Sequence, residues 1–221
     1  MGLLMHGLNI TGMVVLVTVL LSMSIKAQTV LHVENQAKEP LKSAIIEVNT
    51  KKASAPWTAN DKTFIMDQVN KRFSPEVLIV PKSSNVSFPN SDDIRHHVYS
   101  FSPTKPFELK LYAGKPKAPI PFEKQGLVVL GCNIHDGMVG YIYVTDNKNT
   151  FISNERGEVH IDIPAEQITD ITVWHANAQQ GVDYRQSFET FEVKKQRITL
   201  AINTTEPAKT DSFEDVFGHA H

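Results

Sequence analysis

The amino-acid sequence predicts an all-β protein, built as a sandwich or barrel of short strands. Apolar residues alternate with polar ones, or form short continuous runs, at spacings of about ten residues. Pro, Gly, Asn and Ser separate these runs, as they separate the strands of β-sandwiches. Beyond residue 28 no segment shows the helical apolar period of roughly 3.6 residues, so no helix is expected there.

The predicted strands follow one another through most of the chain. Residues 30–34 alternate in polarity, whereas residues 126–130 and 139–144 are continuous apolar runs typical of buried strands. The polar stretch 49–62 is predicted to be a loop or a boundary. In chain order, strands are expected at residues 30–34, 44–48, 63–66, 76–80, 85–88, 97–101, 107–112, 126–130, 139–144, 158–164, 171–175 and 196–202.

Composition and charge narrow the classes of function. The chain has 221 residues, of which 41% are hydrophobic and 21% charged, which is ordinary for a globular protein. Its formal net charge of −2 and its lack of basic clusters exclude a nucleic-acid partner, because phosphate binding needs a concentrated positive surface. Nine His, six Met and one Cys are more informative, since these side chains bind soft and borderline metal ions.

The first 27 residues are predicted to be a secretory signal peptide. Residues 3–25 are mostly apolar, and the small residues Ser22, Ser24 and Ala27 provide a cleavage site. A retained membrane anchor is the alternative, because the apolar stretch approaches the length that spans a bilayer. Either reading predicts a periplasmic or otherwise exported protein, in which the lone Cys132 cannot form an internal disulfide.

One short segment carries an unusual set of metal-binding side chains. Cys132, His135 and Met138 have the spacing C-x2-H-x2-M and lie between two predicted strands. A loop that joins neighbouring strands can turn all three side chains toward one point. Two His, one Cys and a weak axial Met form the ligand set of blue-copper electron-transfer centres, so one more His must come from elsewhere. His96 and His97 are adjacent on a strand and point to opposite faces, so only one of them can be this ligand.

With these residues in view, the sequence resembles the cupredoxin family, in particular plastocyanin and amicyanin. The resemblance implies a Greek-key cupredoxin β-sandwich holding one copper ion of type 1 character, with His96 as the missing ligand and His97 facing outward. It also implies that Asn90 forms a hydrogen bond to the loop that follows Cys132, which would hold the ligands in place. The resemblance to cupredoxins covers residues 63–144. It depends on the motifs at residues 73–75, 86–90 and 96–98 and on the Cys132 loop.

The sequence departs from the family pattern at two positions beside the ligands. Gly131 precedes Cys132 where a bulkier residue is common, and Ile134 stands where the family often has Pro. Both change the packing and hydrogen bonding around the sulfur, and these determine the potential and colour of such a site.

Two further resemblances suggest how the chain is divided. Residues 66–136 also look like cupredoxin-like proteins called methylamine utilisation proteins, and residues 34–48 and 153–174 resemble two halves of a small β-sandwich of the carboxypeptidase-regulatory type. The predicted divisions are residues 1–27 (signal peptide), 28–55 and 145–203 (the two parts of an accessory β-sandwich), 56–144 (the copper domain) and 204–221 (a flexible tail).

These expectations combine into an exported copper protein that exchanges electrons with another extracytoplasmic redox protein. A copper carrier or sensor without redox turnover is one alternative, and a structural sandwich with a vestigial metal loop is another. An enzyme is not expected, because one fully ligated copper leaves no open position for a substrate. No partner is expected in the membrane beyond the signal segment.

Other conspicuous residues are expected to have ordinary roles. His160 and His175 are expected to be satisfied or exposed residues of the accessory strands, and Trp57 and Trp174 to be core or boundary aromatics. The remaining two groups are expected to lie in solvent: the turn carboxylates Asp92, Asp93 and Asp136, and the tail residues His219 and His221.

Overall fold

The computed structural model describes residues 28–189, apart from 117 and 136, and residues 197–204. The predicted signal peptide and nearly all of the predicted tail therefore lie outside the described residues. Within them the fold is all-β, and the only helical element is a 3-10 turn at Ala165–Gln167. No helix in this part of the chain is long and apolar enough to cross a membrane. The predicted all-β sandwich is confirmed.

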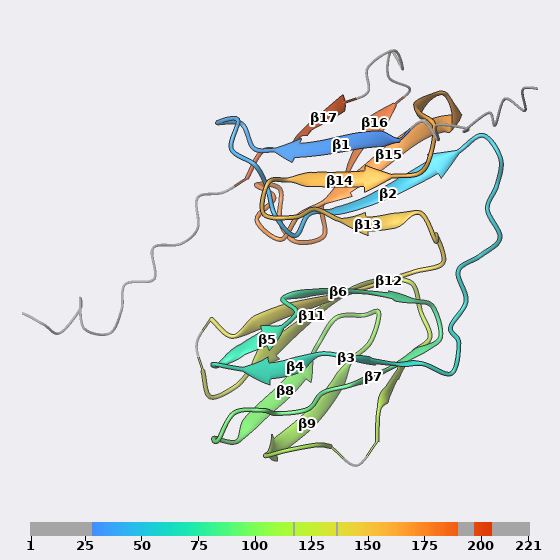
Figure 1. Cartoon of the computed structure of the whole chain (residues 1–221). Helices are drawn as coiled ribbons and strands as arrows, with labels where there is room; N and C mark the ends of the chain where they lie inside the picture. Colours follow the sequence, from blue (N-terminus) through green and yellow to red (C-terminus); the bar gives the residue numbers. More distant parts are fainter. Residues whose placement is uncertain (1–27, 117, 136, 190–196, 205–221) are drawn as a thin grey trace, which may run out of the picture.

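Strands from the middle of the chain form one sandwich, which we call the inner sandwich (Figure 1). A five-stranded sheet, in the order β6-β12-β11-β8-β9, faces a three-stranded sheet, in the order β10-β7-β3, and β4 and β5 form a separate hairpin. The strands are β3 (Thr63–Ile65), β4 (Asp67–Val69), β5 (Arg72–Ser74), β6 (Val77–Pro81), β7 (Ser84–Ser87), β8 (His96–Ser100), β9 (Phe107–Tyr112), β10 (Ile120–Phe122), β11 (Gly126–Cys132) and β12 (Val139–Thr145).

Strands from before and after this region form a second unit, the outer sandwich (Figure 1). Its sheets have the orders β14-β1-β17 and β13-β2-β15-β16, so the chain leaves it after β2 and returns to it at β13. The predicted domain boundaries themselves stay a prediction. The strands are β1 (Thr29–Glu34), β2 (Ile45–Thr50), β13 (Thr150–Ile152), β14 (Glu158–Ile161), β15 (Ile168–Trp174), β16 (Gln186–Glu189) and β17 (Arg197–Ala201).

Both faces of the five-stranded sheet are covered at β11 and β12, which explains the continuous apolar runs of these two strands. Successive side chains of a strand point to opposite faces. Val128, Leu130 and Cys132 of β11 therefore lie in the core of the inner sandwich. Leu127 and Val129 of the same strand face the other way, into an apolar cluster that includes Trp174 of the outer sandwich.

The two sandwiches also meet through a polar cluster around Glu47 of β2. Its carboxylate accepts hydrogen bonds from the hydroxyls of Tyr143 (2.9 Å) and Thr145 (2.7 Å), both on β12. Burial, followed by the nearby Glu47 charge, raises the pKa of Tyr143 to about 12, although Arg185 opposes the rise. Trp174, 1% exposed, packs beside these residues with its ring 6.5 Å from that of Tyr143. The expectation that Trp174 is a core aromatic is confirmed.

Five short strands were not predicted from the sequence: β4, β5, β10, β13 and β16. Each has three or four residues, too few for the alternation of polarity to be recognised. The hairpin of β4 and β5 turns at Asn70 (φ 54°) and Lys71 (φ 58°), both left-handed, without the glycine that usually marks such a turn.

Candidate metal centre

The loop between β11 and β12 brings Cys132 and His135 to one end of the inner sandwich. The amide of Cys132 donates to the carbonyl of Met138 (3.2 Å), and the amide of Met138 donates to the carbonyl of His135 (3.3 Å). Gly137 has φ +74°, a left-handed conformation that favours glycine. These bonds close the loop into a compact turn and hold its two ligand candidates at a defined separation.

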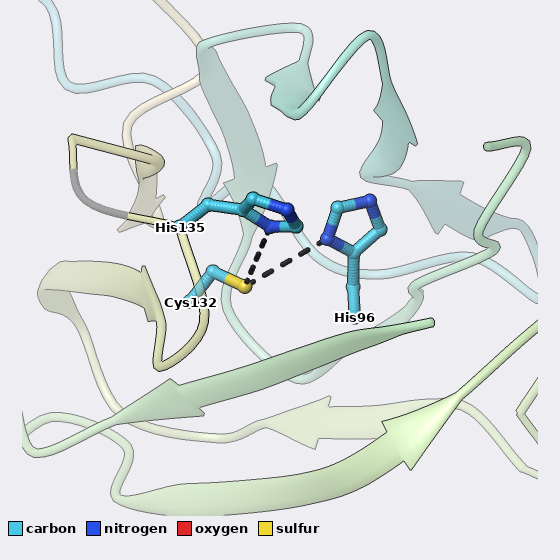
Figure 2. A group of neighbouring side chains, drawn as sticks. All are labelled: His96, Cys132 and His135. Atoms are coloured by element: carbon cyan, nitrogen blue, oxygen red, sulfur yellow. Dashed lines mark hydrogen bonds between the residues drawn. The ribbon is translucent and has the colours of Figure 1, made fainter. Parts of the chain in front are cut away.

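His96 completes a three-residue cluster from the neighbouring strand. β8 pairs with β11 through Val98 and Cys132, and His96, at the start of β8, is fully buried. The Sγ atom of Cys132 lies 3.7 Å from Nδ1 of His96 and 3.7 Å from Nδ1 of His135, as Figure 2 shows. Among the described residues this is the only group of three or more His, Cys, Asp or Glu side chains that could hold a metal ion.

His97 has the outward orientation that the strand alternation predicts. Its Nε2 lies 3.0 Å from Oε1 of Glu108 on β9, and its ring packs edge-on against Tyr99, with the ring centroids 5.7 Å apart. The choice between the two adjacent histidines therefore falls on His96, which faces the sulfur.

The distances from the Cys132 sulfur to the two imidazole nitrogens fit a bound metal ion. Bonds of about 2.3 Å to a thiolate and about 2.0–2.1 Å to an imidazole, meeting at roughly 120°, separate sulfur from nitrogen by about 3.7–3.8 Å. Both Cys132–His contacts have this separation, 3.7 Å. One thiolate and two imidazoles suit borderline and soft ions, copper and zinc among them.

The electrostatic environment favours the neutral imidazole that metal binding requires. Desolvation by burial is the largest cause that lowers the pKa of His135, and the charges of His96 and Lys71 lower it further. The charge of Asp92 opposes this shift. Because a metal ion competes with the proton for the ring nitrogen, a lowered pKa leaves Nδ1 of His135 free to bind near neutral pH.

Asp92 has a role that the sequence analysis missed. Its Oδ2 lies 2.7 Å from Nε2 of His96, and its carboxylate also accepts the amides of Asn70 (2.6 Å) and Lys71 (2.9 Å). Desolvation raises the pKa of Asp92, but the hydrogen bonds from Lys71, His96 and Asn70 outweigh it and lower the pKa overall. The expectation that Asp92 is a solvated turn residue was wrong, because the hairpin of β4 and β5 folds over it.

Asn90 supports the site through different contacts from those expected. Its side-chain amide donates to the carbonyls of Ile94 (2.8 Å) and Tyr112 (2.9 Å), and its Oδ1 accepts the amide of Asp92 (3.1 Å). These bonds use both amide hydrogens, so among the described residues none goes to the loop after Cys132. Asn90, only 4% exposed, instead fixes the turn that carries Asp92 toward His96.

Met138 lies in the same apolar cluster as Cys132 and is 3% exposed. Its backbone closes the metal loop, as described above. Its predicted role as a weak axial ligand stays a prediction.

The other histidines of the described residues lie apart from the cluster. His160 is exposed on β14, whereas His175 is buried just after β15, with Nε2 3.2 Å from the carbonyl of Lys42. Asp136, His219 and His221 lie outside the described residues.

Comparison with known proteins finds similarity only at the level of structure. No family model matches the chain, and no curated protein matches it. A purple cupredoxin from Nitrosopumilus maritimus is 23% identical over 38% of this chain and 100% of its own, with a TM-score of 0.33. A reduced amicyanin variant is 19% identical over 44% of this chain and 98% of its own, with a TM-score of 0.32.

A third similar structure is a much longer enzyme. The copper-containing nitrite reductase from Thermus scotoductus is 23% identical over 51% of this chain, with a TM-score of 0.36, and only 28% of its own length is covered. These likenesses do not support the resemblance to methylamine utilisation proteins. The topology and the side-chain cluster define an all-β sandwich protein with a candidate metal centre of His96, Cys132 and His135.

Proposed function

We propose that this chain is an exported electron-transfer protein that holds one type 1 copper ion through His96, Cys132, His135 and Met138. The observation that carries the proposal is the position of Cys132 Sγ, which lies 3.7 Å from the Nδ1 atoms of both histidines. A bound copper ion would supply one-electron chemistry by alternating between Cu(I) and Cu(II). The chain would then act as a carrier of electrons and not as an enzyme.

The surrounding residues support fast electron exchange because they hold the ligands still. His96 is fully buried and braced by Asp92, and Cys132 is 8% exposed at the end of a paired strand. The hydrogen bonds of the 132–138 loop fix His135 relative to Cys132. Ligands that are held in one arrangement need little movement when the charge of the ion changes, so the barrier to electron exchange stays low.

His135 would be the point of electron entry and exit. Unlike His96, it is only half-buried, and two exposed apolar side chains lie close to it in sequence: Ile134 (48% exposed) in the same loop and Val139 (40% exposed) at the start of β12. A small apolar surface of this kind suits brief contact with a second extracytoplasmic redox protein, because transient electron-transfer complexes bury little area.

The test is the visible absorption and EPR spectrum of the protein after one equivalent of Cu(II) is added. We expect an intense thiolate-to-copper charge-transfer band and a narrow copper hyperfine splitting. Both should disappear in Cys132→Ser and in His96→Asn, because each variant removes one donor of the cluster.

His97→Asn is the matched control, since His97 adjoins His96 but faces the opposite side of the sheet. It should leave both spectroscopic signals in place. A colourless copper complex that Cys132→Ser does not alter would contradict the type 1 site. Tight copper binding with no measurable electron exchange would instead favour the copper carrier.

A further inference from the structure

A cavity of about 600 Å³ lies on the outward face of β8 and β9, beside the metal loop. Its lining includes the aromatic side chains of Tyr99 and Phe101 and the polar groups of His97 and Glu108. Phe107 also borders it, but its ring packs into the core against Phe88 and Phe122. Ligand sites in proteins have this size and this composition, with mostly apolar walls and a few polar groups that orient the ligand.

This face is free because the outer sandwich covers only the other half of the sheet. The apolar cluster around Trp174 includes outward-facing residues of β6, β11 and β12, but none of β8 or β9. Figure 1 shows β8 and β9 on the side of the inner sandwich away from the outer sandwich. Phe101 is 84% exposed, and its ring centroid lies 5.1 Å from that of Tyr99. Contiguous exposed apolar side chains, unlike isolated ones, mark binding surfaces, and Phe101 and Tyr99 are contiguous.

The polar groups of the cavity indicate a cationic ligand. Glu108 keeps 51% of its side chain exposed, and among the described residues only the ring of His97 lies within ion-pair distance, with Nε2 3.0 Å from Oε1. The second carboxylate oxygen is therefore available to a ligand. The faces of aromatic rings also attract cations, most strongly when water is partly excluded. A carboxylate and aromatic rings in one cavity therefore complement a positive charge attached to an apolar body.

We propose that this cavity binds a small organic cation with an aromatic body, such as an arylalkylammonium ion. The ammonium group would bind Glu108, and the aromatic body would pack against the neighbouring rings of Tyr99 and Phe101. The site goes beyond the proposed electron transfer and does not depend on copper, because none of its lining residues belongs to the metal cluster.

The cavity nevertheless lies close to the residues immediately before and after Cys132 in the sequence. Asn133 lines the cavity, and a Cβ atom placed on Gly131 would lie 2.7 Å from Cζ of Tyr99. The Tyr99 ring therefore rests directly on the backbone before Cys132, where a bulkier residue would displace it. A ligand that moves this ring should perturb the Cys132 amide, which makes the metal loop a reporter of binding.

The experiment is a titration of the metal-free full chain, followed by amide chemical shifts in two-dimensional NMR. The probes are phenethylammonium, phenethyl alcohol and phenylacetate, which share a ring and differ in charge. We expect saturable shifts in β8, β9 and residues 131–133. Phenethylammonium should bind about fivefold more tightly than the alcohol, the size expected for one partly exposed ion pair, and phenylacetate should bind most weakly.

Two variants and one control separate charge from packing. Glu108→Gln should abolish the preference for the ammonium ion while leaving binding of the alcohol unchanged, and Phe101→Ala should weaken both. Leu111→Ala, which removes an exposed side chain of β9 outside the cavity, should change neither. Equal binding of the ammonium and carboxylate probes, shifts confined to other strands, or no saturable shifts would each overturn the proposal. All of these results are independent of the copper spectra.

Discussion

Nε2 of the buried His96 lies 2.7 Å from Oδ2 of Asp92, on the side of the ring opposite Cys132. A ring nitrogen that donates to a carboxylate fixes the tautomer of the imidazole and increases the basicity of the other nitrogen. Asp92 is itself held by the amides of Asn70 and Lys71, so a hairpin remote from the ligands in sequence determines the orientation of His96.

Replacing Asp92 should therefore weaken metal binding without removing a ligand. We expect Asp92→Ala to lower the affinity for copper by about 10–100-fold, as is usual when a carboxylate behind a histidine ligand is lost. Competition with a chromophoric chelator measures this affinity. Asp93→Ala is the control, since Asp93 is exposed and, among the described residues, the carboxylate paired with His96 is that of Asp92. Equal affinities of the Asp92 variant and the unmodified protein would refute the bracing role of this carboxylate.

The stability of the folded protein should decrease at acidic pH, and His175 should contribute to this decrease. Burial lowers the pKa of this side chain from its ordinary value of 6.5, while the Lys42 carbonyl and the Glu76 charge oppose the shift. Nδ1 also accepts the amide of Asn177 (3.2 Å), a bond that a proton on Nδ1 would break. Because the folded state disfavours the protonated ring, this contribution is complete above pH 6.5 and is lost as the pH falls toward the lowered pKa.

Thermal unfolding between about pH 8 and about pH 5 tests this dependence on His175. We expect His175→Gln to show a smaller fall in Tm across this range than the unmodified protein. His160→Gln, at an exposed site, should behave like the unmodified protein. Identical pH profiles for all three proteins would show that His175 does not contribute.

A larger residue at Gly140 of β12 should destabilise the fold. A Cβ atom at this position would lie 2.7 Å from Cβ and 2.8 Å from Cγ of Phe73, whose side chain is 3% exposed. We expect Gly140→Ala to lower the free energy of unfolding by about 1–3 kcal/mol, the usual cost of overpacking a core. Chemical denaturation measures this change.

The double variant that combines Gly140→Ala with Phe73→Ala is an internal control. Its loss of unfolding free energy should be smaller than the sum of the two single losses, because Phe73→Ala empties the space that the new methyl group would enter. Fully additive losses would mean that the new methyl group does not meet Phe73.

The hydrogen bond between Glu47 and Tyr143 should stabilise the contact between the two sandwiches. Hydrogen bonds to a charged group contribute about 1.5–3 kcal/mol, so a double-mutant cycle of Glu47→Gln and Tyr143→Phe should give a coupling energy near this range. The pKa of Tyr143, about 12, should also fall in Glu47→Gln because the nearby negative charge is removed. Ultraviolet pH titration measures the pKa, and a coupling energy near zero would contradict the role of this bond.

Several elements could be predicted because their information is local. The continuous apolar runs at residues 126–130 and 139–144 correspond to β11 and β12, and the spacing of Cys132, His135 and Met138 identified the loop between them. Short strands such as β10 and β13 escaped prediction because three residues form a strand only when a partner strand supplies the hydrogen bonds. The structure brings His96, Cys132 and His135 together, whereas the ligand role of Met138 remains untested.

By itself, the sequence determined the all-β class, the candidate metal-binding loop and the pair of histidines that could supply one further ligand. These depend on residue type and on spacing along one or two strands. Only the tertiary structure decided that His96 faces the sulfur, that Asp92 braces it and that Asn90 holds the turn of Asp92. The physical reason is distance along the chain: Cys132 and His96 are 36 residues apart, and the Asp92 carboxylate binds amides 21 and 22 residues away. Such contacts arise from the pairing and packing of strands, which a local sequence pattern does not predict.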